Sequence, residues 1–156
     1  MKAYDIYAIG NALVDTEIEV SDDFLIADLD VQISITHSNV SYLDGYLTGP
    51  DGQRIELFSE VGGSGDHFEK TIFDDQSQTP ITKSRAPYQG SFIPEALLKR
   101  QPSLNYFNGK SIKGVWQLVI RGSRNQRFGM LHGWALIVKP KDDMLEQPAA
   151  SDNDEE

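Results

Sequence analysis

Alternating apolar and polar residues run through much of the chain and predict strands. In the segment 29–36 every second residue from Leu29 to Ile35 is apolar, and the residues between them are polar. Because successive side chains of a strand point to opposite faces, we expect this segment to bury one face and expose the other. Shorter segments with the same period lie at 16–20, 54–58 and 116–121.

One further segment, 133–138, is apolar at almost every position, which is typical of an inner strand. Loop signals rich in Gly, Pro, Asn and Ser separate the strands, and only 94–99 resembles a helical turn, with Pro94 at its start. Many short strands with turn-rich joins predict an all-β fold, a β-sandwich or jelly roll. Trp116 and Trp134 lie in apolar strands and are expected in its core.

Length and charge limit the function classes. The 156 residues are enough for one domain, and the absence of cysteine excludes disulfides and thiolate metal sites. With 14 basic and 24 acidic residues the net charge is −10, which argues against binding to nucleic acid. No apolar run reaches the roughly 20 residues of a membrane span.

The acidic residues are concentrated at the end of the chain. Seven of them, and no basic residue, lie between Asp142 and Glu156. Since this stretch is also poor in large apolar residues, we expect 141–156 to be a disordered acidic tail. The start, Met1 to Asp5, shows no secretory signal, so a cytoplasmic location is the default expectation.

No catalytic residue is predicted. The segment 62–66 departs from the Gly-x-Ser-x-Gly pattern of a serine nucleophile because Asp66 replaces the last glycine. His37, His67 and His132 are scattered, without the i, i+4 spacing of a helical zinc site, and we expect structural roles for them.

Loop carboxylates offer a different chemistry. Asp66, Asp74 and Asp75 fall in or beside loops, where carboxylate and backbone oxygens suit a hard cation such as calcium. The alternative is that these side chains cap turns. A group of aromatic residues near loops forms either a rim for peptide or sugar contact or a cover for the open end of the sandwich: Tyr42, Tyr46, Phe68, Phe73, Tyr88 and Phe92.

Several segments, taken in order, resemble the P domain (Homo B domain) of proprotein convertases and bacterial subtilisin-like proteases. The resemblance covers about Thr16 to Val138 and is carried by 35–52, 62–68, 73–75, 86–94, 107–109, 114–118 and 129–136. It implies a jelly-roll β-sandwich over residues 16–140. It also implies a non-catalytic role, because P domains follow a serine protease domain and support its folding, its stability and its response to calcium or pH. Since relatives in this family are mostly exported, the resemblance conflicts with the cytoplasmic default, and the location stays open.

The same resemblance implies a metal site. Family members often bind calcium through loop carboxylates, and Asp44, Asp66, Asp74 and Asp75 occupy matching motif positions.

Three positions depart from the family pattern. Tyr42 replaces the aspartate of the usual Gly-Asp-Leu, and Arg121 and Arg127 stand where acidic residues are expected. We expect any calcium site that used those carboxylates to be weakened or lost.

A shorter resemblance concerns the amino end. Residues 4–21 look like the start of PfkB-family carbohydrate kinases, in which the aspartate matching Asp15 binds substrate hydroxyls, and 63–66 resembles that family's Gly-Ala-Gly-Asp. The long helix and alternating β-α units of a kinase are missing. We therefore interpret 1–15 as a kinase-like leader before the P domain. The alternatives are a degenerate kinase fragment and a carbohydrate- or peptide-binding adhesion module.

Overall fold

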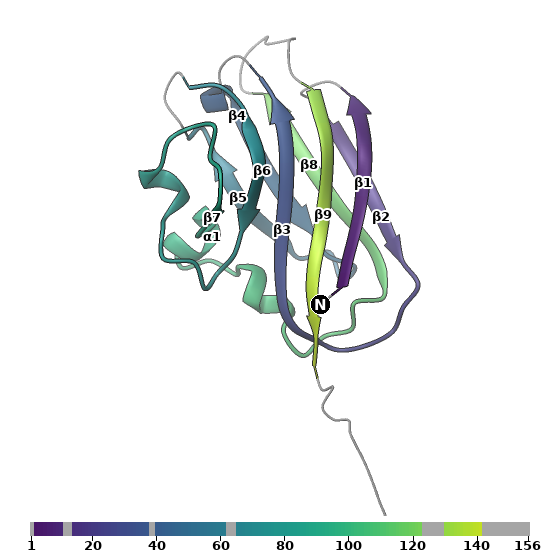
Figure 1. Cartoon of the computed structure of the whole chain (residues 1–156). Coiled ribbons are helices and arrows are strands. Elements are labelled where there is room, and N and C mark those ends of the chain that lie inside the picture. Colours follow the sequence, from purple (N-terminus) through teal and green to yellow (C-terminus); the bar gives the residue numbers. More distant parts are fainter. Residues whose placement is uncertain (1, 11–13, 38–39, 62–64, 123–129, 142–156) are drawn as a thin grey trace, which may run out of the picture.

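Two sheets packed face to face make up the described part of the chain, which is residues 2–10, 14–37, 40–61, 65–122 and 130–141 of a computed structural model (Figure 1). The five-stranded sheet has the order β1-β9-β3-β6-β7 and the four-stranded sheet the order β2-β8-β4-β5. Neighbouring strands are antiparallel except for β6 and β7. The predicted all-β sandwich is confirmed, and its jelly-roll connectivity stays a prediction.

The strands vary from two to eleven residues. They are β1 (Lys2–Gly10), β2 (Val14–Val20), β3 (Ile26–Thr36), β4 (Leu43–Thr48), β5 (Arg54–Ser59), β6 (Phe68–Phe73), β7 (Ser91–Phe92), β8 (Gly114–Gly122) and β9 (Met130–Pro140). Short helical turns join some of them: the 3-10 turns η1 (Val40–Tyr42), η2 (Ile81–Lys83) and η3 (Leu104–Phe107), and the helix α1 (Glu95–Leu98). None of these helices is long and apolar enough to cross a membrane.

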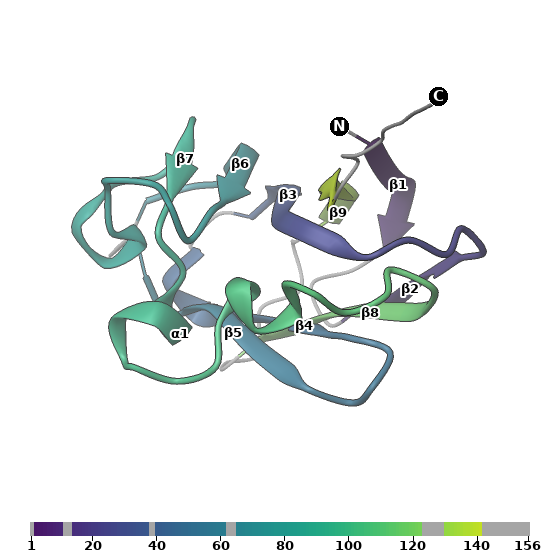
Figure 2. The same ribbon diagram turned by 90° about the horizontal axis from the view of Figure 1, so that it is seen from below.

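The alternation in the sequence determines which faces meet. In β3 the apolar series from Leu29 to Ile35 is buried, and the polar residues between them are more exposed, as the period of two predicts. In β8 Trp116, Leu118 and Ile120 are buried in the same way. Figure 2, which views the sandwich from below, shows the two layers that these faces join.

Aromatic rings fill much of the space between the layers. The ring of Trp116 lies 4.8 Å from that of Phe107, and its indole nitrogen donates to the carbonyl oxygen of Ile112 at 2.8 Å. Trp134 is only 2% exposed. Four aromatic residues considered for a binding rim belong to the core instead, which supports their role as a cover for the sandwich: Phe68, Phe73, Tyr88 and Phe92.

The amino-terminal segment is part of both sheets. β1 lies at the end of the five-stranded sheet, where Lys2 pairs with Val138 of β9. β2 lies at the end of the other sheet and pairs with β8. The residues interpreted as a kinase-like leader therefore supply an edge strand. Of the predicted tail 141–156, all but Lys141 lie outside the described residues.

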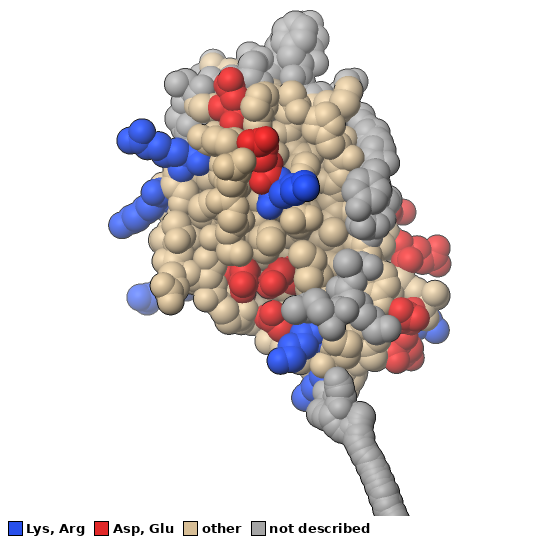
Figure 3. All heavy atoms as spheres, in the orientation of Figure 1, with Lys and Arg blue, Asp and Glu red and all other residues tan. Residues whose placement is uncertain are grey.

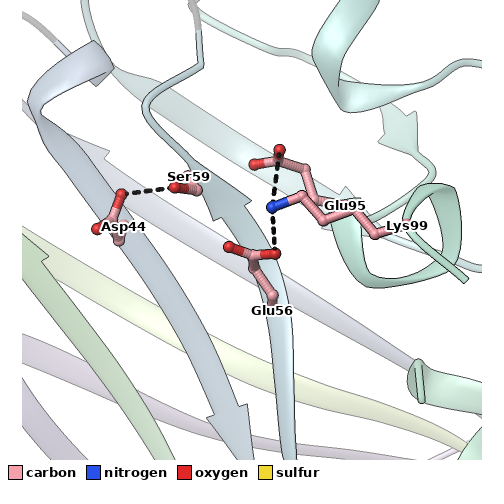
Figure 4. A network of polar contacts seen from close by, with 5 residues as sticks. All are labelled: Asp44, Glu56, Ser59, Glu95 and Lys99. Atoms are coloured by element: carbon pink, nitrogen blue, oxygen red, sulfur yellow. Dashed lines mark hydrogen bonds and ion pairs between the residues drawn. The ribbon is translucent and has the colours of Figure 1, made fainter. Parts of the chain in front are cut away.

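A small ionic network holds α1 against β5 (Figure 4). Lys99, directly after the helix, places its Nζ 2.8 Å from a carboxylate oxygen of Glu56 and 3.9 Å from one of Glu95. Glu95 is only 7% exposed, and burial raises the pKa of its carboxyl group above the usual value. Lys99 therefore offsets part of the cost of burying Glu95.

Neighbouring residues of β8 test the arrangement of the core. Trp116 is fully buried, whereas Val115 is 43% exposed. We expect Trp116→Ala to lower the free energy of unfolding by about 3–5 kcal/mol, because it leaves a large cavity. Val115→Ala should change it by less than about 0.5 kcal/mol. Urea denaturation measures both values, and similar losses for the two variants would contradict the arrangement.

Candidate functional site

Three carboxylates meet on the outer face of the five-stranded sheet. Asp28 and Asp30 are two residues apart on β3 and therefore share its outward face, since Leu29 between them is buried. Asp74 directly follows β6, and the pairing of Val31 with Phe73 brings it beside Asp30. One side-chain oxygen from each of the three lies within 4.8 Å of the others. Figure 3, which shows this face, has acidic side chains gathered in its central part.

The charges of this cluster are poorly compensated. Burial is the main cause that raises the pKa of Asp30 to about 7, and the charges of Asp28 and Asp74 add to it. Burial also raises the pKa of Asp28, which Lys139 partly counteracts. One oxygen of Asp30, Oδ1, is buried without a hydrogen-bond partner in the described part of the protein. The cluster therefore favours a bound positive charge, either a proton or a cation.

Gln76 provides part of the missing hydrogen bonding. Its backbone N–H donates to Oδ1 of Asp74 at 2.8 Å. With its side-chain nitrogen turned toward the cluster, the amide also donates to Asp74 at 2.7 Å and to Asp28 at 2.9 Å. These donors hold Asp28 and Asp74 in place, whereas Oδ1 of Asp30 lacks a partner among the described residues. Chemically, the cluster is a set of hard oxygen donors of the kind that calcium and magnesium use.

The structure does not bring the four aspartates of the predicted metal set together. Only Asp74 belongs to the cluster. Asp75 accepts hydrogen bonds from the hydroxyl of Ser103 at 2.7 Å and the backbone N–H of Asn105 at 2.8 Å, so it anchors η3. This is the capping role weighed as the alternative from the sequence.

Asp44 and Asp66 lie elsewhere. Asp44 is on β4 of the other sheet and accepts a hydrogen bond from the hydroxyl of Ser59 at 3.0 Å. Asp66 is exposed and precedes β6, whereas Asp74 follows it, so roughly 20 Å of strand separates the two. One ion cannot bind both.

Sequence reasoning missed Asp28 and Asp30 as site residues. They stand in the polar positions of an alternating strand, where an acidic residue is ordinarily a solvated one. The available signal was two aspartates at i, i+2 spacing on one strand. The pairing of β3 with β6, which adds Asp74, is not visible in the sequence.

Arg121, expected to weaken a family calcium site, forms an ion pair of its own. Its guanidinium contacts both carboxylate oxygens of Asp15, at 2.6 and 3.2 Å. This hydrogen bonding lowers the pKa of Asp15. In the register of the sheet Arg121 also stands opposite Asp44. Asp15, which the kinase resemblance suggested as a substrate ligand, therefore joins β2 to β8. Arg127 and residues 62–64 lie outside the described residues.

Solved structures with a similar fold come from the serine protease of one bacterium. The serine protease of Aeromonas sobria in complex with the chaperone matches with a TM-score of 0.54 and 18% identity over 88% of this chain. The serine protease of the same organism alone gives a TM-score of 0.52 and 16% identity, also over 88% of this chain. In both cases the chain spans only 26% of the protease.

Sequence comparison identifies the family of this chain. A search of curated proteins found no match, and nothing in the comparisons supports the kinase resemblance of residues 4–21. The model of the proprotein convertase P-domain matches residues 26–138, which is well over half of the chain. It begins at the first residue of β3 and ends within β9, so it covers the sandwich strands that follow β1 and β2. The chain belongs to the proprotein convertase P-domain family.

Proposed function

We propose that this P domain is a non-catalytic unit that packs against a subtilisin-like serine protease domain and stabilises it. The observation that carries the proposal is the family match over residues 26–138. The fold neighbours add support, because in them a similar sandwich makes up about a quarter of a serine protease.

The contacts of two histidines agree with a non-catalytic role. Nδ1 of His67 accepts a hydrogen bond from the backbone N–H of His37, and Nε2 of His132 lies 2.5 Å from the hydroxyl oxygen of Thr36. Within the described part of the chain neither ring is oriented by a carboxylate, as the histidine of a Ser-His-Asp triad is.

Association with a protease domain is tested by mixing. The purified chain is added to the protease domain of a subtilisin-like protease from the same organism, and co-elution and the melting temperature of the protease are measured. We expect a complex and a higher melting temperature of the protease, because binding to the folded state stabilises it. Peptide hydrolysis by the chain alone that is lost on replacing one serine would contradict the proposal.

The carboxylate cluster is the second part of the proposal. We propose that Asp28, Asp30 and Asp74 bind a cation of the calcium class. Supporting this are the short separations of their oxygens, their hard-donor chemistry and the buried Oδ1 of Asp30 that lacks a partner. A divalent cation would replace the proton that Asp30 otherwise holds.

Without a cation, the cluster should make stability depend on pH. Between pH 4 and 7 the folded state keeps a proton on Asp30 that the unfolded chain releases, so stability falls as pH rises through this range. We expect Asp30→Asn to reduce this fall and to raise stability at pH 8 by about 1 kcal/mol, or ~2–4 °C in melting temperature. Melting in chelator from pH 5 to 8 measures it.

Asp66→Asn serves as the control for this measurement, because Asp66 is exposed and lies outside the cluster. It should keep the pH dependence of the unchanged protein. If Asp30→Asn melted with the same pH profile as Asp66→Asn, the uncompensated charge would not reside on Asp30.

Calcium should reverse the loss of stability at high pH. At pH 8, we expect calcium at 100 times its dissociation constant to stabilise the domain by about 2.7 kcal/mol relative to chelator. Asp30→Asn and Asp74→Asn should lose most of this gain, and Asp66→Asn should retain it. Two results would rule out this site. One is a calcium shift of equal size in all variants, and the other is no shift in the unchanged protein at 10 mM calcium, which is roughly 10 to 100 times the dissociation constant of a weak site.

A further inference from the structure

A groove crosses the outer face of the five-stranded sheet, on the side of the carboxylate cluster toward Thr36. Two adjoining cavities of about 790 and 470 Å³ share Ser34, Lys70 and His132 and so form one depression. The hollow has a simple cause. In β9, Gly133 stands opposite Ser34 and Ala135 stands opposite Gln32, so two positions of this face carry almost no side chain.

One wall of the groove carries regularly spaced polar groups. Gln32, Ser34 and Thr36 occupy successive outward positions of β3, the same row that begins with Asp28 and Asp30. Such positions repeat about every 6.6 Å along a strand, which is also the two-residue repeat of an extended peptide. The polar side chains of this row can therefore form hydrogen bonds with every second residue of a peptide backbone that lies along the strand.

Lys70 supplies a positive charge in the middle of the groove. Its backbone N–H donates to the hydroxyl oxygen of Ser34 at 3.0 Å, and its φ of 46° lies in the left-handed region. Its ammonium group forms no ion pair with the described residues. Glu69, the acidic residue of the lining, already accepts a hydrogen bond from the amide of Gln89 at 3.1 Å.

Two residues of the groove have a strained backbone. Besides Lys70, His67 of the lining has a positive φ of 69°. Strained conformations of non-glycine residues persist only where the surroundings hold them, and they cluster at ligand sites. Together with the hollow and the unpaired lysine, the strain indicates a surface shaped for a ligand.

We propose that this groove binds an extended segment of a separate polypeptide, with one acidic side chain of the segment paired to Lys70. The backbone of the segment runs along Gln32, Ser34 and Thr36, and its carboxylate contacts the ammonium group of Lys70. A single carboxylate is the best match, because the net charge of −10 repels strongly acidic segments. The proposal stands apart from the cation site and needs no protease domain to be tested.

The test uses the full chain and three labelled ten-residue peptides of alternating threonine and serine. They differ only at one central position, which is glutamate, glutamine or lysine. Fluorescence anisotropy gives the affinities, and NMR shift mapping locates the contact. We expect the glutamate peptide to bind about tenfold tighter than the glutamine peptide, and the shifts to include Gln32, Ser34 and Gly133.

Lys70→Gln should abolish the preference for glutamate, whereas Lys113→Gln, an exposed lysine on another loop, should leave it unchanged. Three results would overturn the proposal: no preference for glutamate, an equal preference in Lys70→Gln, or shifts outside the groove. Binding that appears only after removal of residues 142–156 would identify the chain's own acidic segment as the occupant, and would also overturn the assignment to a separate polypeptide.

Discussion

Burial of two apolar sheet faces against each other is the interaction on which the rest of the structure depends. In β3 and β8 the apolar side chains point into the core, which contains Trp116 and Trp134, and the polar side chains between them point outward. Burial of the apolar side chains fixes the register in which each strand pairs with its neighbours, because a slip by one residue would expose the whole apolar row. The positions of the outward-facing polar side chains are thereby fixed as well. The positions of Asp28, Asp30, Ser34 and the groove follow from this constraint.

The outer face of the five-stranded sheet carries charged residues that the packing of the core does not require. A sandwich of this kind could place any polar residue at positions 28 and 30, yet two aspartates stand there, beside a third at the end of β6. Their mutual repulsion and partial burial destabilise the charged form of Asp30. In the same sheet, Lys70 is left without an ion pair among the described residues, although the carboxylates lie only a few residues away along β3. Lys70 therefore offers a charge that a partner of opposite sign can complement.

The sequence was most informative where the pattern of apolar residues along a strand matches the pattern of burial in the structure. The strand over 29–36 was predictable because the core buries every second residue of it, and the inner strand over 133–138 because nearly all of its residues are buried. β1 was not predicted as a strand of the sandwich, since its segment was compared with a kinase amino terminus. Only its pairing with β9 makes it part of the sheet. The carboxylate cluster depends on the register between β3 and β6, a non-local pairing that no local pattern encodes. The sequence motif did indicate Asp74, but it also grouped it with Asp66, from which a whole strand separates it.

The central claim is that Asp30 holds a proton that a cation replaces, and proton release measures this exchange directly. Calcium is titrated into the protein in weakly buffered solution near pH 6.5, which lies below the pKa of about 7 that burial gives Asp30. The change in pH is recorded for the unchanged protein and for Asp30→Asn. We expect a substantial fraction of one proton to be released per ion bound, and almost none from the variant. Calcium binding without proton release, or equal release from Asp30→Asn, would contradict the claim.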